Sequence, residues 1–289
     1  MLYAGHRQVA PYGQPLLPLW TILEAAGIQD EATICLDAGD PLSWPGVGSK
    51  WLDRSPGGYD WYLGETADAV ADPVFTGGVG DLRSTTFWAL DGASWFKYDS
   101  ANEAFMNAWH ANGAAYTFMF LVYLADGAAD GGLIGATTIP GAMAANVAVV
   151  MLTGKLVAIA EDASASKGGF YANSLVTSVD ALPAGWHMLA VSVDEAVGAG
   201  GGFLYCDGAY LPTAEAGGAD TFNSAYAVPG TGSAATTYRL GRWGTYGDLT
   251  AVKPISNGSR IMGFASLNKA ASKAELDAVW ELSRKRLGI

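Results

Sequence analysis

The amino-acid sequence predicts an all-β fold: a two-sheet antiparallel jelly-roll sandwich with a short C-terminal helix and an N-terminal arm. The 289 residues are 50% hydrophobic and only 15% charged, which is enough apolar material for a large core. The 38 glycines and 12 prolines imply many turns and short elements. Apolar runs of roughly five to nine residues alternate with Gly, Asp and Asn turns, a spacing typical of sandwiches rather than of repeating βαβ units.

Expected strands follow one another along most of the chain. The most distinct local signal is a hairpin, in which apolar runs at 202–206 and 209–211 flank the dipeptide Asp207-Gly208, a sequence that favours a two-residue turn. The other expected strands cover residues 32–36, 61–64, 86–90, 95–98, 115–124, 132–137, 147–151, 155–160, 185–193, 237–242 and 259–266.

Two segments carry helix signals. The run SKAE at 272–275 is a capping box, and apolar residues near one helical face follow it before three basic residues and Gly288. The run SANE at 100–103 repeats the capping pattern, with Phe105 and Trp109 four residues apart. We expect a terminal helix packed on the domain and a short helix between strands.

The first 30 residues differ in kind, because prolines break them and an apolar run follows. We therefore divide the chain into an arm, residues 1–30, and one jelly-roll domain, residues 31–289. Leu16, Leu19, Trp20 and Leu23 can form one stripe of a short helix. Two interpretations stand equally: an arm packed on its own domain, or an attachment and oligomerisation segment.

Charge and hydropathy exclude several classes of partner. Lys plus Arg total 16 against 28 Asp plus Glu, and a net charge of -12 disfavours nucleic acid, whose backbone is bound through released counterions. No apolar run reaches the ~18 residues of a membrane helix, so we expect no membrane insertion. Prolines interrupt the first twenty residues, which predicts that there is no secretory signal peptide and that synthesis is cytoplasmic.

Metal and redox signals are weak. Cys35 and Cys206 lie in apolar, strand-like runs and are predicted to be reduced core residues. Three scattered histidines form no zinc motif with them. Aspartates that flank strand ends could gather around calcium, but their spacing is typical of turns and caps. These aspartates are Asp37, Asp40, Asp53, Asp60, Asp91, Asp99 and Asp207.

Aromatic residues are the clearest functional signal. The chain has 10 Trp, 13 Tyr and 10 Phe, and sugars bind by stacking their CH faces on Trp and Tyr. Trp51, Tyr59 and Trp61 lie in a Gly, Pro and Asp rich stretch, and Trp243 with Tyr246 lies in a second, so we predict them as carbohydrate-binding residues, Trp243 first. A tryptophan in a β-sandwich is more often a buried core residue than a ring that stacks on a ligand. The tryptophans predicted for the core are Trp88, Trp95, Trp186 and Trp280.

The sequence lacks the motifs of the enzymes that share such folds. A sandwich-type glucanase carries two carboxylates on one strand face, written E-x-D-x-x-E, and that motif is absent. The adjacent acidic pairs at 161–162 and 194–195 would point to opposite faces of a strand. There is no G-x-S-x-G elbow, and the glycines at 198–202 open no helix. We therefore expect no enzymatic activity.

Six fragments in order carry a family resemblance: WLDRSPGGYDWYLG, FWALDGASWFKY, GWHMLAVSVD, GGFLYCDGAYL, YRLGRW and RIMGFASLNKAASKAELDAVW. Together they resemble the concanavalin A-like lectin/glucanase superfamily in its laminin-G-like or pentraxin-like form, over residues 34–287. The loop DRSPGGYDWYLG and the helix at 100–112 are most similar to versions in bacteriophage and gene transfer agent structural proteins.

The resemblance implies sugar binding at loops or a concave face, in some members with calcium, for which no paired Asp-Asn site can be aligned here. It further implies a spike, fibre or tail component on the virion surface that touches host cell-surface polysaccharide. We expect a homo-oligomer held to other virion proteins by the arm. Two alternatives remain: a purely structural decoration or adaptor protein, and a polysaccharide hydrolase with an unusual carboxylate pair.

Overall fold

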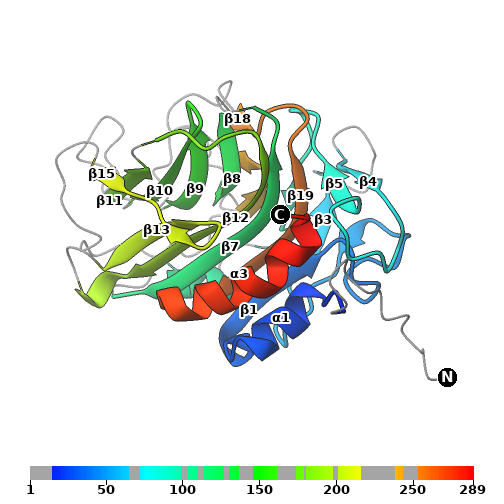
Figure 1. The fold of residues 1–289 in the computed structure, drawn as a ribbon, viewed down its shortest axis with the longest axis horizontal. Coiled ribbons are helices and arrows are strands. Elements are labelled where there is room, and N and C mark those ends of the chain that lie inside the picture. The colour runs from blue at the N-terminus through cyan, green and yellow to red at the C-terminus, as the bar shows by residue number, and fades with distance from the viewer. Residues whose placement is uncertain are drawn as a thin grey trace.

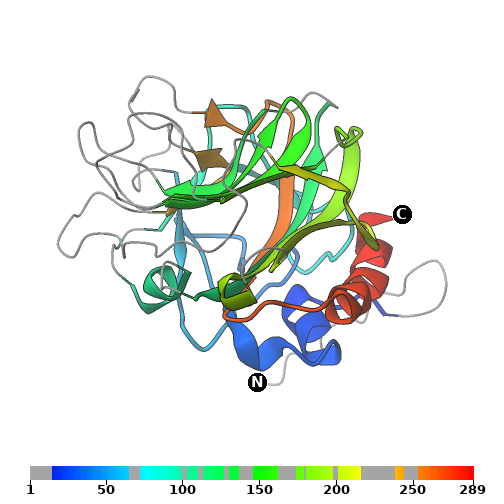
Figure 2. The same cartoon turned by 90° about the vertical axis from the view of Figure 1, so that its left-hand side faces the viewer.

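The computed structural model confirms the two-sheet sandwich (Figure 1). Among the described residues, one sheet has eight strands and the other eleven, and their pairings are antiparallel except for one parallel contact between β18 and β8. Helices α1 (Leu19–Ala25) and α3 (Lys273–Leu287) lie side by side against the outside of the eight-stranded sheet (Figure 2). The structure describes residues 15–64, 72–98, 100, 103–109, 113–126, 130–136, 146–161, 174–178, 180–197, 201–215, 238–243 and 253–289.

The eight-stranded sheet has the order β14-β13-β12-β7-β19-β5-β4, and β1 also pairs with β19. Its centre is the long antiparallel pair β7 and β12, whose strands run in register over ten residues. Its strands are β1 (Ala32–Asp37), β4 (Val74–Thr76), β5 (Phe87–Ala89), β7 (Ala115–Leu124), β12 (Gly185–Asp194), β13 (Gly202–Cys206), β14 (Ala209–Tyr210) and β19 (Arg260–Leu267).

The eleven-stranded sheet has the order β15-β11-β10-β9-β8-β16-β6-β3-β2, with β17 and β18 joined at β8. Its strands are β2 (Lys50–Trp51), β3 (Trp61–Leu63), β6 (Phe96–Lys97), β8 (Gly131–Ala136), β9 (Asn146–Leu152), β10 (Lys155–Glu161), β11 (Ser174–Ser178), β15 (Thr213–Glu215), β16 (Tyr238–Leu240), β17 (Arg242–Trp243) and β18 (Lys253–Pro254).

The predicted hairpin is confirmed. Strands β13 and β14 are joined by Asp207 (φ 50) and Gly208 (φ +89), and two successive positive φ values are what a two-residue turn between right-twisted strands requires. A Cβ atom at Gly208 would lie 2.8 Å from the indole nitrogen of Trp280 on α3. The turn is therefore held closely under the C-terminal helix.

Strand β7 shows how both faces of the eight-stranded sheet are buried. Phe118, Phe120 and Val122 point into the core between the sheets. Met119 and Leu121 point the other way, into a second apolar cluster that includes α1 and α3. Because both faces are covered, the run AYTFMFLVYL is mostly apolar on both faces instead of alternating.

The two ends of the C-terminal helix are capped as the sequence predicts. The Ser272 hydroxyl accepts a hydrogen bond from the Glu275 amide, the Glu275 side chain reaches back to the Ser272 amide, and Gly288 ends the helix in the left-handed conformation. The second predicted helix is α2 (Ala104–Trp109); part of its expected capping box lies outside the described residues. None of the helices in the described part of the chain combines the length and apolar character that a bilayer crossing needs.

A fully buried ion pair joins the two ends of the chain. Both terminal nitrogens of the Arg286 guanidinium lie 2.7 Å from the Asp37 carboxylate oxygens, and both side chains are 0% exposed. Asp37 also accepts a hydrogen bond from the amide of Leu19, at 2.7 Å, and Arg286 donates through Nε to the carbonyl of Leu82. One carboxylate thus links β1, α1 and α3.

The segment that we considered for attachment is part of this core. Leu16, Leu19 and Leu23 are buried, and Trp20 is half-buried against the same apolar cluster. The prediction that these side chains serve attachment or oligomerisation is wrong for Leu16, Leu19 and Leu23, because they are buried within the domain, and it stays a prediction for the half-buried Trp20. The arm-packed interpretation holds for residues 15–30, and residues 1–14 lie outside the described part.

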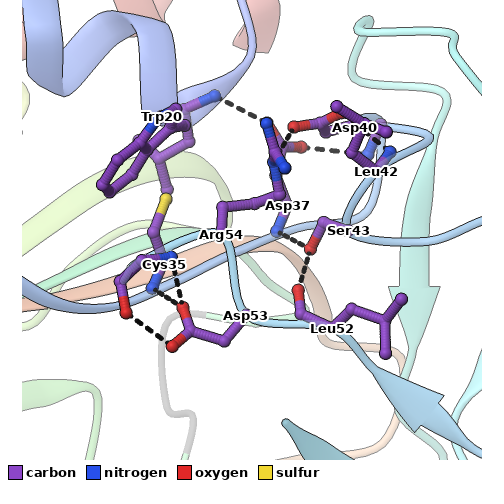
Figure 3. Close-up of polar contacts among 12 residues, drawn as sticks. Trp20, Cys35, Asp37, Asp40, Leu42, Ser43, Leu52, Asp53 and Arg54 are labelled. Carbon is purple, nitrogen blue, oxygen red and sulfur yellow. Dashed lines mark hydrogen bonds and ion pairs between the residues drawn. The ribbon is translucent and has the colours of Figure 1, made fainter. Parts of the chain in front are cut away.

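Short polar contacts organise the loop after β1 (Figure 3). The Ser43 hydroxyl donates to the Leu52 carbonyl at 2.6 Å and accepts from the Asp37 amide at 3.0 Å. Arg54 Nε lies 2.9 Å from Asp40 Oδ2. The strand-end aspartates of this loop act as turn and cap residues, as their spacing predicts.

Candidate functional site

The two tryptophans predicted at the first aromatic stretch are in the core. Trp51 and Trp61 are 0% exposed, and Trp51 packs 4.8 Å from Phe96, centroid to centroid, so neither can stack on a sugar and this prediction is wrong. Tyr59 is half-buried and contacts Phe105 at 4.5 Å. The reason is that the stretch forms strands β2 and β3, whose alternate residues face opposite sides of the sheet.

The other predicted aromatics lie at the edge of what the structure describes. Trp243 ends β17 and pairs with Lys253 of β18, which places its backbone in the eleven-stranded sheet. Tyr246 lies outside the described residues. The prediction of both as carbohydrate-binding residues therefore stays a prediction.

The residues beside the buried tryptophans form a row on the outer face of the sheet. Lys50 pairs with Tyr62, Tyr62 with Lys97, and Lys97 with Arg239, on four neighbouring strands. Their inward neighbours, among them Phe96, belong to the buried core. Because residues directly opposite in a ladder share a face, the four side chains point outward together. We call them the Tyr62 row.

Cations stack on aromatic rings in and beside this row. The Lys50 ammonium lies 4.6 Å from the centroid of the Tyr62 ring. Next to the row, the Arg242 guanidinium lies 3.8 Å from the centroid of the Trp95 ring. Such contacts are worth about 0.5–1 kcal/mol at exposed sites and hold each ring in a fixed orientation.

The row remains partly accessible to solvent. Lys50, Tyr62 and Lys97 are half-buried, whereas Arg239, closer to the middle of the sheet, is 7% exposed. Further along the same outer face, a separate apolar cluster that includes Val150 and Val157 is shielded from solvent. A ligand would therefore meet the Tyr62 end of the face.

The outer face of the eight-stranded sheet offers a second aromatic cluster. Arg260 lies 4.6 Å from the Phe87 ring centroid and 4.5 Å from that of Tyr123, and Trp186 contacts both rings. Trp186 is half-buried, as are Trp95 and Trp280, so of the four tryptophans predicted for the core only Trp88 is fully inside. Helices α1 and α3 pack on this sheet, which leaves less of it for a ligand.

His187, Cys206 and Asp207 form a group whose ligand atoms lie within 4.8 Å of one another. His187 Nδ1 is 2.6 Å from Asp207 Oδ2, and Nε2 is 2.9 Å from the Pro183 carbonyl, which can only accept. Burial lowers the pKa of His187, but the hydrogen bonds to Asp207 and Pro183 outweigh it and the net pKa is raised. Each imidazole nitrogen therefore has a hydrogen-bond partner within the protein.

The thiols near these groups are inert. Burial, and then the Asp207 charge, raise the pKa of Cys206 far above its ordinary value. Burial likewise raises the pKa of Cys35. Both cysteines are free and buried, which confirms that they are reduced core residues without thiolate character at neutral pH.

Among the carboxylates of the described residues, Asp53 most resembles a catalytic acid, because burial raises its pKa. Its oxygens are fully used, however. Oδ1 accepts from the amides of Cys35 and Ser55, and Oδ2 accepts from the Ser55 hydroxyl and the Tyr59 amide, at 2.6 to 2.9 Å. Four donors on two oxygens leave no position for a substrate proton, so Asp53 organises the loop 53–60.

No family model and no curated protein matches the sequence. Among solved structures, the receptor binding domain of botulinum neurotoxin C/D mosaic serotype is similar with a TM-score of 0.52 and 11% identity, over 87% of this chain and 51% of that one. The binding domain of serotype G matches with a TM-score of 0.51 and 12% identity, over 87% and 51%. This chain therefore spans about half the length of those proteins, and the likeness is one of fold, a two-sheet β-sandwich.

The sequence analysis chose the residues of strands β2 and β3 that face the core. Lys50 and Tyr62 are the immediate neighbours of the predicted Trp51 and Trp61. A parity argument could have found them, because a two- or three-residue strand that buries one large ring must present its neighbour outward. That Lys97 and Arg239 join them could not be found, because the partners of a strand are not encoded locally.

Proposed function

We propose that this chain is a non-enzymatic, lectin-like protein that binds cell-surface polysaccharide through the Tyr62 row. The observation that carries the proposal is that the half-buried Tyr62 ring, with the Lys50 ammonium stacked on it, lies on the outer sheet face, and that the half-buried Trp95 ring, with Arg242 stacked on it, is a second such ring. Sugars present apolar CH faces to such rings and hydroxyls to the surrounding donors. The two solved structures described above are named as binding domains, which supports a binding role.

The test is binding of the full chain to a panel of bacterial capsule and O-antigen polysaccharides, measured by isothermal titration. Aromatic contacts are worth about 0.5–1.5 kcal/mol, so Tyr62→Ala and Trp95→Ala should each weaken binding about two- to tenfold. Tyr210→Ala is the matched control, because Tyr210 is an exposed tyrosine, 49% exposed, on the edge of the other sheet. Unchanged affinity in both Tyr62→Ala and Trp95→Ala, or no binding to any polysaccharide, would contradict the proposal.

We propose further that the protein belongs to phage or gene transfer agent particles, as a homo-oligomeric spike or fibre component. The resemblance of the loop 53–64 and of the segment around α2 to such proteins supports this. Mass spectrometry of gradient-purified particles should detect the chain in a fixed ratio to the major capsid protein. Recovery only in the unassembled fraction would count against it.

A purely structural adaptor is the alternative, and one observation favours it. Leu42, Val47 and Val79 are 62%, 77% and 48% exposed, and a Cβ atom at Gly46 would touch Val79, so these apolar side chains stand on adjoining loops. Deleting residues 1–14 tests attachment through the arm without removing α1 from the core. If the truncated chain no longer enters particles but still binds polysaccharide, residues 1–14 serve attachment. If the full chain binds no glycan and the truncated chain no longer enters particles, the adaptor is favoured.

A further inference from the structure

We infer that the outer face of the eight-stranded sheet carries a second binding site, which takes a sugar with a carboxylate group. Its centre is the guanidinium group of Arg260. The rings of Phe87 and Tyr123 lie against this group, and Trp186 contacts both rings. We call these four residues the Arg260 cluster. The inference does not depend on the Tyr62 row, which belongs to the other sheet.

Strand pairing brings the Arg260 cluster together from distant parts of the chain. Arg260 of β19 lies directly opposite Tyr123 of β7, and Tyr123 lies opposite Trp186 of β12. On its other side, Arg260 pairs with Ala89 of β5, two residues from Phe87. Cross-strand partners share a face of the sheet. Because chain neighbours of Ala89, Tyr123 and Arg260 belong to the core between the sheets, this shared face is the outer one.

The Arg260 cluster lies at the margin of the surface that α1 and α3 cover. Along β7, the outward residues Met119 and Leu121 are each 2% exposed and belong to the apolar cluster under the helices. Tyr123, the next outward residue, is half-buried instead, and so are Arg260 and Trp186. A ligand can therefore reach the guanidinium and two of the rings without displacing a helix.

No carboxylate of the described residues compensates the charge of Arg260. Its guanidinium lies 4.6 and 4.5 Å from two ring centroids, but in the described part of the chain it makes no ion pair and no hydrogen bond. Since none of its nitrogens is buried without a partner, each one faces solvent. Arg54, Arg83, Arg284 and Arg286, by contrast, each form an ion pair with a carboxylate. The donors of Arg260 are thus free for a ligand.

A carboxylate suits this guanidinium better than a neutral group does. The planar guanidinium offers parallel N–H donors that match the two oxygens of a carboxylate, and such charge-assisted pairs are about twice as strong as neutral hydrogen bonds. The two stacked rings hold the guanidinium in one orientation, so binding costs less conformational entropy. Arg260 is therefore a preorganised partner for an anion.

The rings of the cluster favour a sugar as the carrier of that carboxylate. The centroids of Tyr123 and Trp186 are 5.6 Å apart and their planes meet at 69°. Two half-buried rings at this angle form a small apolar surface, which suits the CH face of a single sugar ring. On the opposite side of Arg260, Ala89 presents only a methyl group next to Val74, which is 64% exposed. The rest of a sugar chain can leave the site over these two residues.

The experiment titrates the full chain with pairs of matched small probes. Methyl glucuronide and methyl galacturonide each carry a carboxylate where methyl glucoside and methyl galactoside carry a hydroxymethyl group. A blocked peptide, acetyl-Ala-Asp-Ala-amide, tests a protein carboxylate, and inorganic phosphate tests a simple anion. Binding is followed by NMR at the Nε–H group of Arg260 and the indole N–H group of Trp186, which report on this site alone.

The variants separate the charge, the shape of the guanidinium and the ring. Arg260→Gln removes the charge, Arg260→Lys keeps the charge without the fork, and Trp186→Leu removes one ring but keeps an apolar side chain. Arg83→Gln is the matched control, because Arg83 is 59% exposed and pairs with Asp81 on the surface. Circular dichroism verifies that each variant is folded. If Arg260→Gln does not fold, Arg260→Lys and the matched probes decide the result.

We expect one of the two uronides to shift both resonances and to bind at least about tenfold more tightly than its neutral counterpart, because hydrogen bonds to a charged group are strong. Arg260→Gln should remove this preference, and Arg260→Lys should weaken uronide binding about three- to tenfold. Trp186→Leu should weaken uronide binding about two- to tenfold without changing phosphate binding. Arg83→Gln should change it less than about twofold.

Three results would overturn the inference. The first is that neither uronide binds more tightly than its neutral counterpart, or that Arg260→Gln leaves uronide binding unchanged. The second is that the peptide binds more tightly than both uronides, which would assign the site to a protein carboxylate. The third is that phosphate binds as tightly as the uronides and Trp186→Leu weakens neither, which would make Arg260 a general anion contact. The proposed function is tested separately, by Tyr62→Ala on the polysaccharide panel.

Discussion

Replacing Arg286 tests whether the buried ion pair holds the two ends of the chain together. In Arg286→Met the Asp37 carboxylate would keep its hydrogen bonds from the Leu19 and Gly39 amides but lose both charged contacts of 2.7 Å in a site with 0% exposure. Leaving one member of a buried pair uncompensated costs about 3–5 kcal/mol. We expect that loss in the free energy of unfolding.

The assay is equilibrium unfolding in guanidinium chloride, followed by tryptophan fluorescence. The control is Arg284→Met, on the same helix, whose ion pair with Glu281 is exposed and should contribute less than about 0.5 kcal/mol. The double variant Asp37→Asn with Arg286→Met should lose about 1–3 kcal/mol less than the sum of the single changes, because no unpaired charge remains. The reasoning would be refuted if Arg286→Met lost no more unfolding free energy than Arg284→Met, or if the losses of the two single variants simply added in the double variant.

Three further measurements test other parts of the fold. Trp61→Ala should cost about 3–5 kcal/mol of unfolding free energy and Tyr62→Ala less than about 1, because one ring is core and the other faces outward; equal losses would show that the strand is in the wrong register. Ser272→Ala should cost about 1 kcal/mol through the lost capping box, and Ser272→Asp should restore most of it in the same denaturation series. The folded pKa of His187 is raised above 6.5, so its contribution to stability is complete below that pH and is lost as the pH rises through the folded pKa. In His187→Gln the free energy of unfolding should therefore depend less on pH between pH 5 and 9. An unchanged pH dependence would contradict this.

The anchoring of the N-terminal helix changes how attachment should be studied. Because α1 buries Leu19 and Leu23 against the sheet and α3, a truncation through residue 30 would expose core surface and confuse misfolding with lost attachment. The Leu19 amide also donates to the buried Asp37. Only residues before Leu16 can be removed without opening the apolar clusters that the structure describes.

Local sequence was sufficient to predict structure where a motif is formed by residues that are neighbours in the chain. The Asp207-Gly208 turn and the Ser272 capping box were both predicted, because each depends on residues a few positions apart. The all-β sandwich was likewise predicted, from apolar runs and turn residues along the chain. The tryptophans failed for a different reason: β2 and β3 are two and three residues long, too short for a pattern to show which face is buried.

By itself, the sequence determined the kind of fold, the places where the chain turns, the capped helix at its end and the acidic balance of the whole molecule. These follow from composition and near-neighbour chemistry. Only the tertiary structure decided that Lys50, Tyr62, Lys97 and Arg239, drawn from positions up to 189 residues apart, stand in one row. The physical reason is that strand pairing and the direction of each side chain are set by burial of the partner faces, which depends on every layer of the sandwich at once.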